Sequence, residues 1–479
     1  MTIDGASLPW GYKWRSSQFF IIATATISLF SECFLFGFAV PILPYMLETR
    51  LHVDPSRTQN FITTLLTVYG AVSLISAPFI AHFADKTPSR KVPLLLSLFA
   101  CASGTVLVAC APTIWVLMAG QLLQSLASAS VWIVAFATLV DNVDERTKGK
   151  VTSTAMSFIS MGIFAGPMVS GFLLQLLGYW PAWSAALLLL AVDFLARLLM
   201  IEKPSARETK SGSGGGERSP LLSGSDQNAQ TARGNENEAE TTTDDGRPTR
   251  PRGFYRIMLT NPQILASLLN TLALSLILAA FDTTLPLHVR DVFGWRSLPV
   301  GLIFFVLQIP TIALGPGIGW LRDRIGLRYP TTIAWGMLAP LMWLLSVPGH
   351  EFPWGKLEGD KNGQVVYILA IVGIGFCLAF TRGAGTFQMM AVVHDLERQN
   401  PNLFGPYGGN SRLSGLTELP FNIGMMVGPL LSGSFSEYLG YYWTCFVLAA
   451  VALLVAASSW VYMTAKGQEV RDLEDEGMI

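Results

Sequence analysis

Six charged residues lie inside stretches of sequence that are otherwise long and apolar: Glu32, Asp193, Arg197, Asp282, Arg382 and Glu418. A charged side chain near the centre of a membrane helix costs roughly 2.5–3.5 kcal/mol. These groups must therefore be paired, solvated by a cavity or, for the acids, protonated. The chemistry they offer is proton exchange at the carboxyls and anion binding at the guanidinium groups.

Arg382 is the most unusual of the six because its segment, "LAFTRGAGTF" at 378–387, holds no other charge. Arginine stays protonated and so needs an anionic partner. The segment and the residues before it contain four glycines, which leave room for a ligand: Gly373, Gly375, Gly383 and Gly385. Two interpretations stay open. Arg382 forms a fixed bridge to Asp282 or Glu32, or it is a docking site for a carboxylate or enol-type anion.

Two acids have different local surroundings. Glu32 lies in the middle of its apolar stretch without a charged neighbour, and it is the first candidate for proton coupling. The alternative is a protonated carboxyl with a structural role. Asp193 precedes Arg197 by four residues, so the two can pair on one helix face. Asp193 is therefore either a second proton-coupling candidate or half of a self-neutralised pair.

Asp282 and Glu418 complete the set of proton-coupling candidates. Asp282 lies four residues before Pro286, which removes a hydrogen bond to the Asp282 carbonyl and predicts a broken helix near a substrate route. Asp282 is therefore also a candidate for solute binding, together with Arg382. Glu418 lies near the end of its apolar stretch and is interpreted as a gate, a helix cap or a binding group.

The elements that must position these residues are membrane-spanning helices. Hydrophobic residues make up 51% of the 479 residues and charged residues only 14%, with a mean hydropathy of +0.44. A soluble domain carries about 25% charged residues. Spanning helices fit because lipid cannot satisfy exposed backbone groups. The sequence predicts an all-α membrane protein with twelve spans, at 19–46, 60–83, 92–111, 113–140, 151–178, 182–201, 262–289, 298–321, 331–348, 364–393, 413–437 and 442–464.

A polar segment divides the chain into two six-helix bundles. Residues 202–253 are rich in glycine and serine and then acidic, which predicts a disordered cytosolic linker. The bundles are expected at 19–201 and 254–465. They are flanked by a cytosolic N-terminal segment at 1–18 and an acidic cytosolic tail at 466–479. The bias of lysine and arginine between loops places both termini in the cytosol.

The two bundles repeat each other in sequence. "GIFAGPMVSG" at 162–171 parallels "GMMVGPLLSG" at 424–433, and "HFADKTPSRK" at 82–91 parallels "GWLRDRIGLR" at 319–328. Each pair is six predicted spans apart. Two similar six-helix halves are typical of transporters that handle substrate at the interface between halves.

These motifs resemble the major facilitator superfamily. The loop motif is matched by Gly319, Asp323, Arg324, Gly326 and Arg328, and more weakly by Asp85, Lys86 and Arg90. The resemblance implies that these loops tether helices and gate the change of face. A second set resembles the antiporter motif of the superfamily: Gly162, Gly166, Pro167 and Gly171, repeated at Gly428 and Pro429. Simple close packing of helices is the alternative reading of this set.

"ECFLFGFAVPILP" at 32–44 and "TELPFNIGMMVGP" resemble the first and eleventh helices of vesicular amine transporters, within the drug:proton antiporter branch. Arg382 stands where those proteins hold an aspartate, which argues against a monoamine substrate. Tyr69 replaces a lysine, Gln121 replaces an arginine, and Gln124 matches. Two interpretations of these three residues stay open: they pack and bond between helices, or they line a mixed polar and aromatic solute cavity.

The expected function is secondary transport. No nucleophile constellation or phosphate-binding loop is present, so we expect no enzyme activity, ATP drive, cofactor, metal or nucleic-acid partner. The favoured prediction is a monomeric proton antiporter that exports a small organic solute from the cytosol by alternating access. A facilitator, a symporter and a non-transporting sensor stay open. "ERSPLLS" places Leu221 and Leu222 in a pattern that resembles an acidic dileucine signal for a sorting adaptor, so the vacuolar or vesicular membrane is an alternative to the plasma membrane.

Overall fold

The computed structural model describes the following parts of the chain: residues 11–86, 91–143, 148–201, 258–349, 351–352, 355–356, 361–399 and 410–464. The predicted linker at 202–253, the tail at 466–479, Arg90 and the sorting pair Leu221 and Leu222 lie outside these residues. The side chains of Asp85, Lys86 and Asp323 lie outside them too, although their backbone belongs to described helices.

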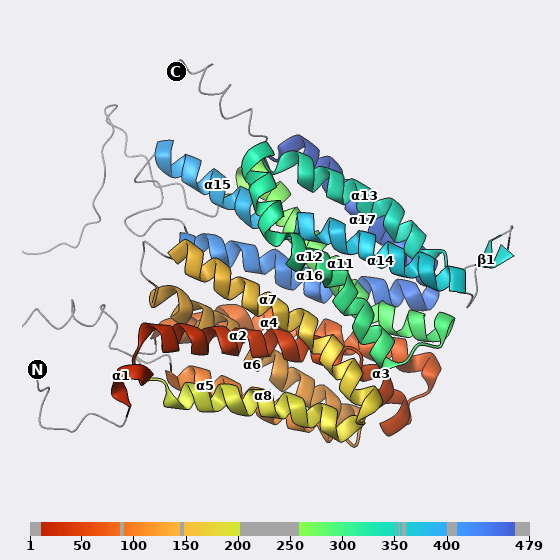
Figure 1. Ribbon diagram of the computed structural model, residues 1–479, viewed down its shortest axis with the longest axis horizontal. Helices are drawn as coiled ribbons and strands as arrows, with labels where there is room; N and C mark the ends of the chain where they lie inside the picture. Colours follow the sequence, from red (N-terminus) through yellow and green to blue (C-terminus); the bar gives the residue numbers. More distant parts are fainter. Residues whose placement is uncertain are drawn as a thin grey trace, which may run out of the picture.

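The first half of the chain forms one helical bundle. Its elements are α1 (Tyr12–Arg15), α2 (Gln18–Ala39), α3 (Leu43–Tyr45), the π-helix η1 (Met46–Arg50), α4 (Pro55–Lys86), α5 (Lys91–Ala109), α6 (Ile114–Asp141), α7 (Lys148–Leu176) and α8 (Tyr179–Leu199). Figure 1 shows these elements in red to yellow, with their long helices side by side. One end of the bundle carries α1 and the other carries α3; we call them the α1 end and the α3 end.

The second half forms a matching bundle beside the first, drawn in green to blue in Figure 1. Its helices are α11 (Pro262–Phe293), α12 (Ser297–Ile325), α13 (Arg328–Ser346), α14 (Lys361–Thr381), α15 (Ala384–Gln399), α16 (Asn410–Tyr438) and α17 (Tyr441–Tyr462). Two residues each of β1 (Glu351–Phe352) and β2 (Gly355–Lys356) pair antiparallel between α13 and α14. The described chain is otherwise helices and short connections, which confirms the all-α prediction.

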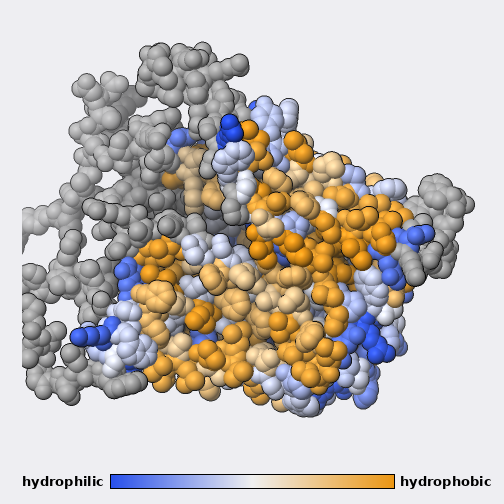
Figure 2. All heavy atoms as spheres, viewed as in Figure 1, coloured by the Kyte–Doolittle hydropathy of each residue, from blue (hydrophilic) through white to orange (hydrophobic). Residues whose placement is uncertain are grey.

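Ten helical segments of the described chain are long and apolar enough to cross a membrane. The helices α13 and α16 run alongside them and complete the twelve predicted spans, although their sequences are more polar. Figure 2 shows a surface dominated by hydrophobic side chains, with hydrophilic residues gathered toward the ends. Each half buries its own apolar core, centred on Phe38 and Trp183 in the first and on Phe281 and Trp335 in the second.

Three predicted spans differ from the structure. The first ends at Ala39 rather than 46, because Pro41 and Pro44 interrupt the helix before α3 and η1. The predicted span 364–393 is divided into α14 and α15. The predicted break near Asp282 is wrong: α11 continues through Pro286 as one helix of 32 residues. A proline removes one hydrogen bond, and the packing of α11 within its bundle maintains the helix.

Candidate functional site

Arg382 lies at the point where the tenth span breaks. Helix α14 ends at Thr381 and α15 begins at Ala384, so Arg382 and Gly383 form a turn between them. Gly383 has a φ of +74°, a left-handed conformation that glycine adopts without strain. The Arg382 amide still donates to the Leu378 carbonyl at 2.9 Å, and the helix resumes when the Phe387 amide donates to the Gly383 carbonyl at 2.9 Å.

The side chain of Arg382 reaches across to the other half of the protein. Its guanidinium carbon lies 5.4 Å from the centre of the Phe164 ring, on α7. Its Nη1 atom is buried without a hydrogen-bond partner, and the described residues provide no ion pair for it. The fixed bridge to Asp282 or Glu32 is therefore not formed in this structure. A cation with an unfilled donor between two halves can receive an anionic group.

Glu32 lies on α2, in the first half, and faces a small polar cluster. Its side chain is only 4% exposed, and its Oε1 atom has no hydrogen-bond partner. The side chains of Cys101 and Ser128 lie next to its carboxyl. The neighbouring residue Cys33 lies close enough to Arg382 and Glu418 for both of their charges to act on its thiol. Glu32 and Arg382 thus stand on opposite halves of one central region without pairing.

The three predicted cavity residues have unequal roles. Tyr69 stacks at a tilt on Phe36, with ring centres 5.3 Å apart, and its hydroxyl lies beside Ser128. Gln124 donates to Thr105 at 2.8 Å and so joins α6 to α5. Gln121 is buried, and its Oε1 atom has no hydrogen-bond partner. Tyr69 therefore belongs with Glu32, Gln124 connects helices, and Gln121 presents an unfilled acceptor.

Asp193 and Arg197 are connected through a residue that the sequence did not single out. Ser28 on α2 donates to Asp193 Oδ1 at 2.6 Å and accepts from Arg197 Nη2 at 3.1 Å. All three side chains are fully buried, between α2 and α8 of the first half. The network neutralises the two charges inside one bundle and joins its first and last spans.

Asp282 and Glu418 stand apart from this network. Asp282 is half-buried on α11, and Glu418 is exposed on α16 toward the α1 end. Neither carboxylate forms an ion pair with another described residue. Asp282 and Glu418 can therefore take a proton or contact a solute without breaking an existing bridge.

The repeated glycine motif performs the same packing in both halves. Gly162 and Gly166 on α7 lie against the backbone of α2, and Gly171 lies against the carbonyl of Ser297 on α12. In the second copy, Gly424 and Gly428 on α16 lie against α11, and Gly433 lies against Thr63 on α4. In each copy the first two glycines contact their own bundle and the last contacts the opposite one. Close packing is thus part of the role of Gly166–Pro167 and Gly428–Pro429, as the sequence allowed.

The loop motif forms the turn between α12 and α13. Gly326, with a φ of +82°, ends α12, and the Arg328 guanidinium lies 4.9 Å from the Trp460 ring of α17. Arg324 lies 5.2 Å from Trp320, while Asp323 and the exposed Gly319 belong to the end of α12. Sequence analysis missed Arg322, which donates from Nη2 to the carbonyls of Phe380 and Arg382 at 2.5 and 3.0 Å. The sequence feature that could have indicated Arg322 is its position as a basic residue in the last turn of α12.

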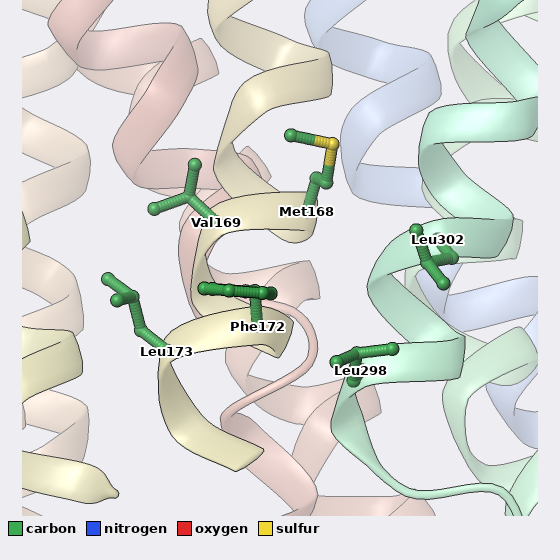
Figure 3. A pocket seen from close by; sticks show the side chains of 6 residues that line it. All are labelled: Met168, Val169, Phe172, Leu173, Leu298 and Leu302. Carbon is green, nitrogen blue, oxygen red and sulfur yellow. The ribbon is translucent and has the colours of Figure 1, made fainter. Parts of the chain in front are cut away.

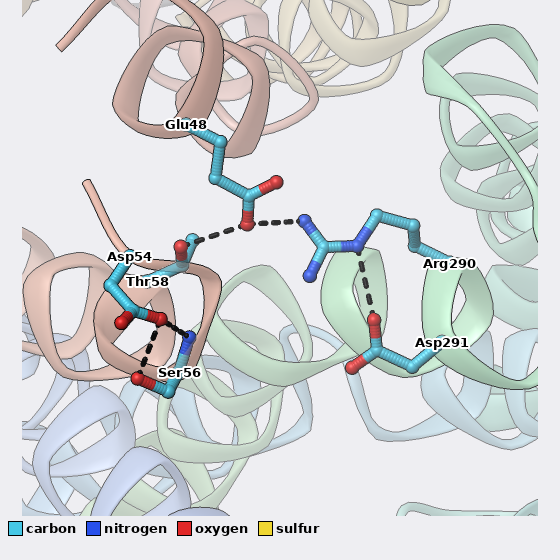
Figure 4. Close-up of polar contacts among 6 residues, drawn as sticks. All are labelled: Glu48, Asp54, Ser56, Thr58, Arg290 and Asp291. Atoms are coloured by element: carbon cyan, nitrogen blue, oxygen red, sulfur yellow. Dashed lines mark hydrogen bonds and ion pairs between the residues drawn. The ribbon is translucent and has the colours of Figure 1, made fainter. Parts of the chain in front are cut away.

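At the α3 end, polar contacts join the two halves. Arg290 of α11 approaches Glu48 of η1 to 2.5 Å, and Thr58 donates to the same carboxylate at 2.8 Å (Figure 4). Three further hydrogen bonds cross between the halves here, from Asn60 to Glu437, from Gln59 to the Thr283 carbonyl and from the Leu298 amide to Gln175.

An apolar groove also lies between the halves. It has a volume of about 490 Å³ and is lined by residues of α7 and α12, next to the point where Gly171 contacts Ser297. Its lining is entirely hydrophobic: Met168, Val169, Phe172, Leu173, Leu298 and Leu302, shown in Figure 3. No group of histidine, cysteine or acidic side chains in the described chain could hold a metal ion.

The sequence profile of the Major Facilitator Superfamily matches residues 25–398. The chain belongs to this superfamily. An uncharacterized MFS-type transporter of Schizosaccharomyces pombe is 30% identical over 454 residues, covering 93% of this chain and 95% of that protein. The MFS-type transporter ppzB of Metarhizium rileyi is 27% identical, covering 95% and 97%. The class B tetracycline resistance protein of Escherichia coli is 26% identical, covering 68% and 76%.

Solved structures show the same superfamily fold. The nucleoside transporter NupG superposes with a TM-score of 0.63 at 12% identity, covering 92% of this chain and 98% of NupG. The human organic anion transporter MFSD10 gives 0.56 at 17% identity, covering 92% and 99%. The predicted major facilitator fold is confirmed. The narrower resemblance to vesicular amine transporters stays a prediction.

Proposed function

We propose that this superfamily member exchanges protons for a small organic anion, which it exports from the cytosol by alternating access. The observation that carries the proposal is Arg382, whose guanidinium faces the other half with a buried, unpartnered Nη1 and no ion pair among the described residues. A permanent cation so placed requires an anion during at least part of the cycle. Asp282 and Tyr69 would contact the rest of the solute, and Gln121 has an open acceptor for it.

Glu32 would carry the proton. Its carboxyl is buried, has one unpartnered oxygen and stands on the half opposite Arg382. The two ligands would occupy the protein in turn: the solute anion balances the charge of Arg382 on the outward step, and the proton occupies Glu32 on the return step. Release of the solute and of the proton on different faces would couple the two movements. Asp193 is already bonded to Ser28, so Asp282 and Glu418 are the better second proton sites.

The conformation supports a single central site with two faces. The halves are bonded at the α3 end through Glu48 and Arg290. We assign the α1 end to the cytosol from the lysine and arginine bias, with both termini there. This state is then closed toward the medium or the organelle lumen. We propose a monomer in the plasma membrane or a vacuolar membrane, with Leu221 and Leu222 as the sorting signal that would decide between them.

Tetracycline is the first probe, because it carries an ionisable enol and because relatives of this chain are tetracycline resistance proteins. Purified protein in liposomes with a pH-sensitive dye inside should show proton movement that depends on tetracycline or benzoate. Arg382→Gln should abolish transport of both probes. Glu32→Gln should retain solute-for-solute exchange but lose proton movement. Arg296→Gln, at an exposed position before α12, is the matched control and should behave as wild type.

Other outcomes separate the alternatives. A facilitator moves the probe without protons, and a symporter moves both in the same direction. A sensor moves neither across a broad panel of organic anions and amines. Intact anion transport in Arg382→Gln would remove the central argument of the proposal.

A further inference from the structure

We propose that Arg322 is a positioning residue for Arg382: it holds the break in the tenth span and so sets the direction of the Arg382 side chain. The inference rests on the proposed function, in which Arg382 receives the solute anion. Arg322 itself touches no solute in this scheme. It acts on the backbone from α12, a different helix of the same half.

Arg322 contacts the backbone directly at the break between α14 and α15. Arg322 Nη2 lies 2.5 Å from the Phe380 carbonyl oxygen and 3.0 Å from that of Arg382. The Phe380 carbonyl belongs to the last turn of α14 and the Arg382 carbonyl to the turn that follows it, where the carbonyls of a helix end lack partners further along the helix. The guanidinium also lies 5.7 Å from the ring of Phe387, on α15. One side chain thus contacts both helices that meet at the break.

The break requires such a group because it lies inside a predicted membrane span. Unsatisfied carbonyls in this environment cost several kcal/mol each. A cation at the carboxyl end of a helix also interacts favourably with the helix dipole. Arg322 meets both needs for α14. Without it, a continuous helix through 381–384 would satisfy the carbonyls better, and Arg382 would turn to another helix face.

The geometry explains how the position of Arg382 is set. Its carbonyl is fixed by Arg322, its amide by Leu378, and the next residue, Gly383, takes the left-handed conformation. With both sides of the residue fixed, the side chain extends toward Phe164. Arg322 also directly precedes Asp323 in the loop motif. A movement of that motif would therefore move the anion site.

The test compares Arg322→Gln and Arg322→Lys with the control Arg296→Gln. Hydrogen exchange of the peptide 378–387 is measured in the full-length protein without solute. Transport of tetracycline and benzoate into liposomes gives KM and kcat. Arg322→Gln should change exchange at the break by about tenfold or more, the effect of losing a charge-assisted hydrogen bond. It should raise KM about tenfold while kcat stays within about twofold. Arg322→Lys should show smaller changes in both the exchange and the KM. The control Arg296→Gln should change neither.

Each other result counts against the inference. Unchanged exchange at the break in Arg322→Gln shows that the residue does not hold it. Altered exchange with an unchanged KM shows a helix cap without influence on Arg382. If wild type transports neither probe, or if Arg382→Gln binds both normally, the proposed function fails. The exchange measurement still decides whether Arg322 fixes the break.

Discussion

Glu48 and Arg290, which are 242 positions apart in sequence, form a salt bridge of 2.5 Å between the two halves. The side chains of Arg290 and Glu48 are 30% and 23% exposed, and Thr58 and Asp291 extend the contact on either side. The bridge lies at the α3 end, opposite to the end where the loop motif lies. We interpret this salt bridge as a contact that stabilises the conformation seen here, in which the halves are joined at the α3 end.

Removal of the salt bridge between Glu48 and Arg290 should open the α3 end more often. A partly exposed pair of this kind contributes about 0.2–1 kcal/mol, so Glu48→Gln should raise the open population by a factor of about 1.4 to 5. A cysteine at Thr63, which is buried against Gly433, reports opening through its reaction with a membrane-impermeant maleimide. The exchanged pair Glu48→Arg with Arg290→Glu should return labelling toward the original rate. Equal labelling in all three proteins would show that the bridge has no such role.

Ser28 should be essential to the stability of the first half. Ser28→Ala removes the hydroxyl between Asp193 and Arg197 and should lower the free energy of unfolding by about 1–3 kcal/mol. Arg197→Met leaves Asp193 buried without its cation and should cost about 3–5 kcal/mol. The double variant Asp193→Leu with Arg197→Met should be more stable than Arg197→Met alone. Unfolding in sodium dodecyl sulfate measures the stability of all three variants, and a double variant no more stable than Arg197→Met would contradict the network.

Two glycines should respond to alanine with opposite signs. A Cβ at Gly166 would lie 2.7 Å from the Phe38 amide nitrogen on α2, so Gly166→Ala should destabilise the protein by about 1–3 kcal/mol. Gly336 on α13 has open space around it, so Gly336→Ala should stabilise by about 0.5–1 kcal/mol. The melting temperature in detergent distinguishes them. A tolerated alanine at Gly166 would show that α2 and α7 can separate without cost.

Asp54 should give a stability contribution that depends on pH. It lies outside the spans, before α4, and accepts hydrogen bonds from the Ser56 amide at 2.9 Å and hydroxyl at 2.8 Å. These bonds, the amide first, lower the pKa of Asp54 below its ordinary value of 3.8. A lowered pKa means that the contribution is complete above 3.8 and is lost as pH falls through the folded-state value. Asp54→Ala should therefore melt below wild type at pH 7, and the difference should shrink at pH 3. A difference that does not change with pH would exclude the carboxylate as its source.

Much of the architecture was readable from residues close together in sequence. Long apolar stretches predicted the spans because lipid tolerates only internally bonded backbone. The two copies of the glycine motif predicted two equivalent halves, and the structure shows Gly171 and Gly433 in equivalent contacts between them. The unusual charges were also visible, since a single arginine in an apolar stretch requires an explanation wherever it lies.

Other features followed only from the packing of distant segments. Pro286 predicted a break that α11 does not have, whereas the break at Arg382 was not predicted. The difference arises because the carbonyls at Arg382 have an external donor in Arg322, from another span. Local sequence shows where a helix can be interrupted, but not whether a neighbour will satisfy the interruption.

The sequence by itself determined the membrane class, the two halves and the residues whose charge had to be accommodated. Those properties depend on composition and on repeats along the chain. The tertiary structure decided which charges are neutralised, as at Asp193, and which remain open, as at Arg382. The physical reason is that burial and pairing depend on contacts between helices, and a one-dimensional pattern contains no record of which faces meet.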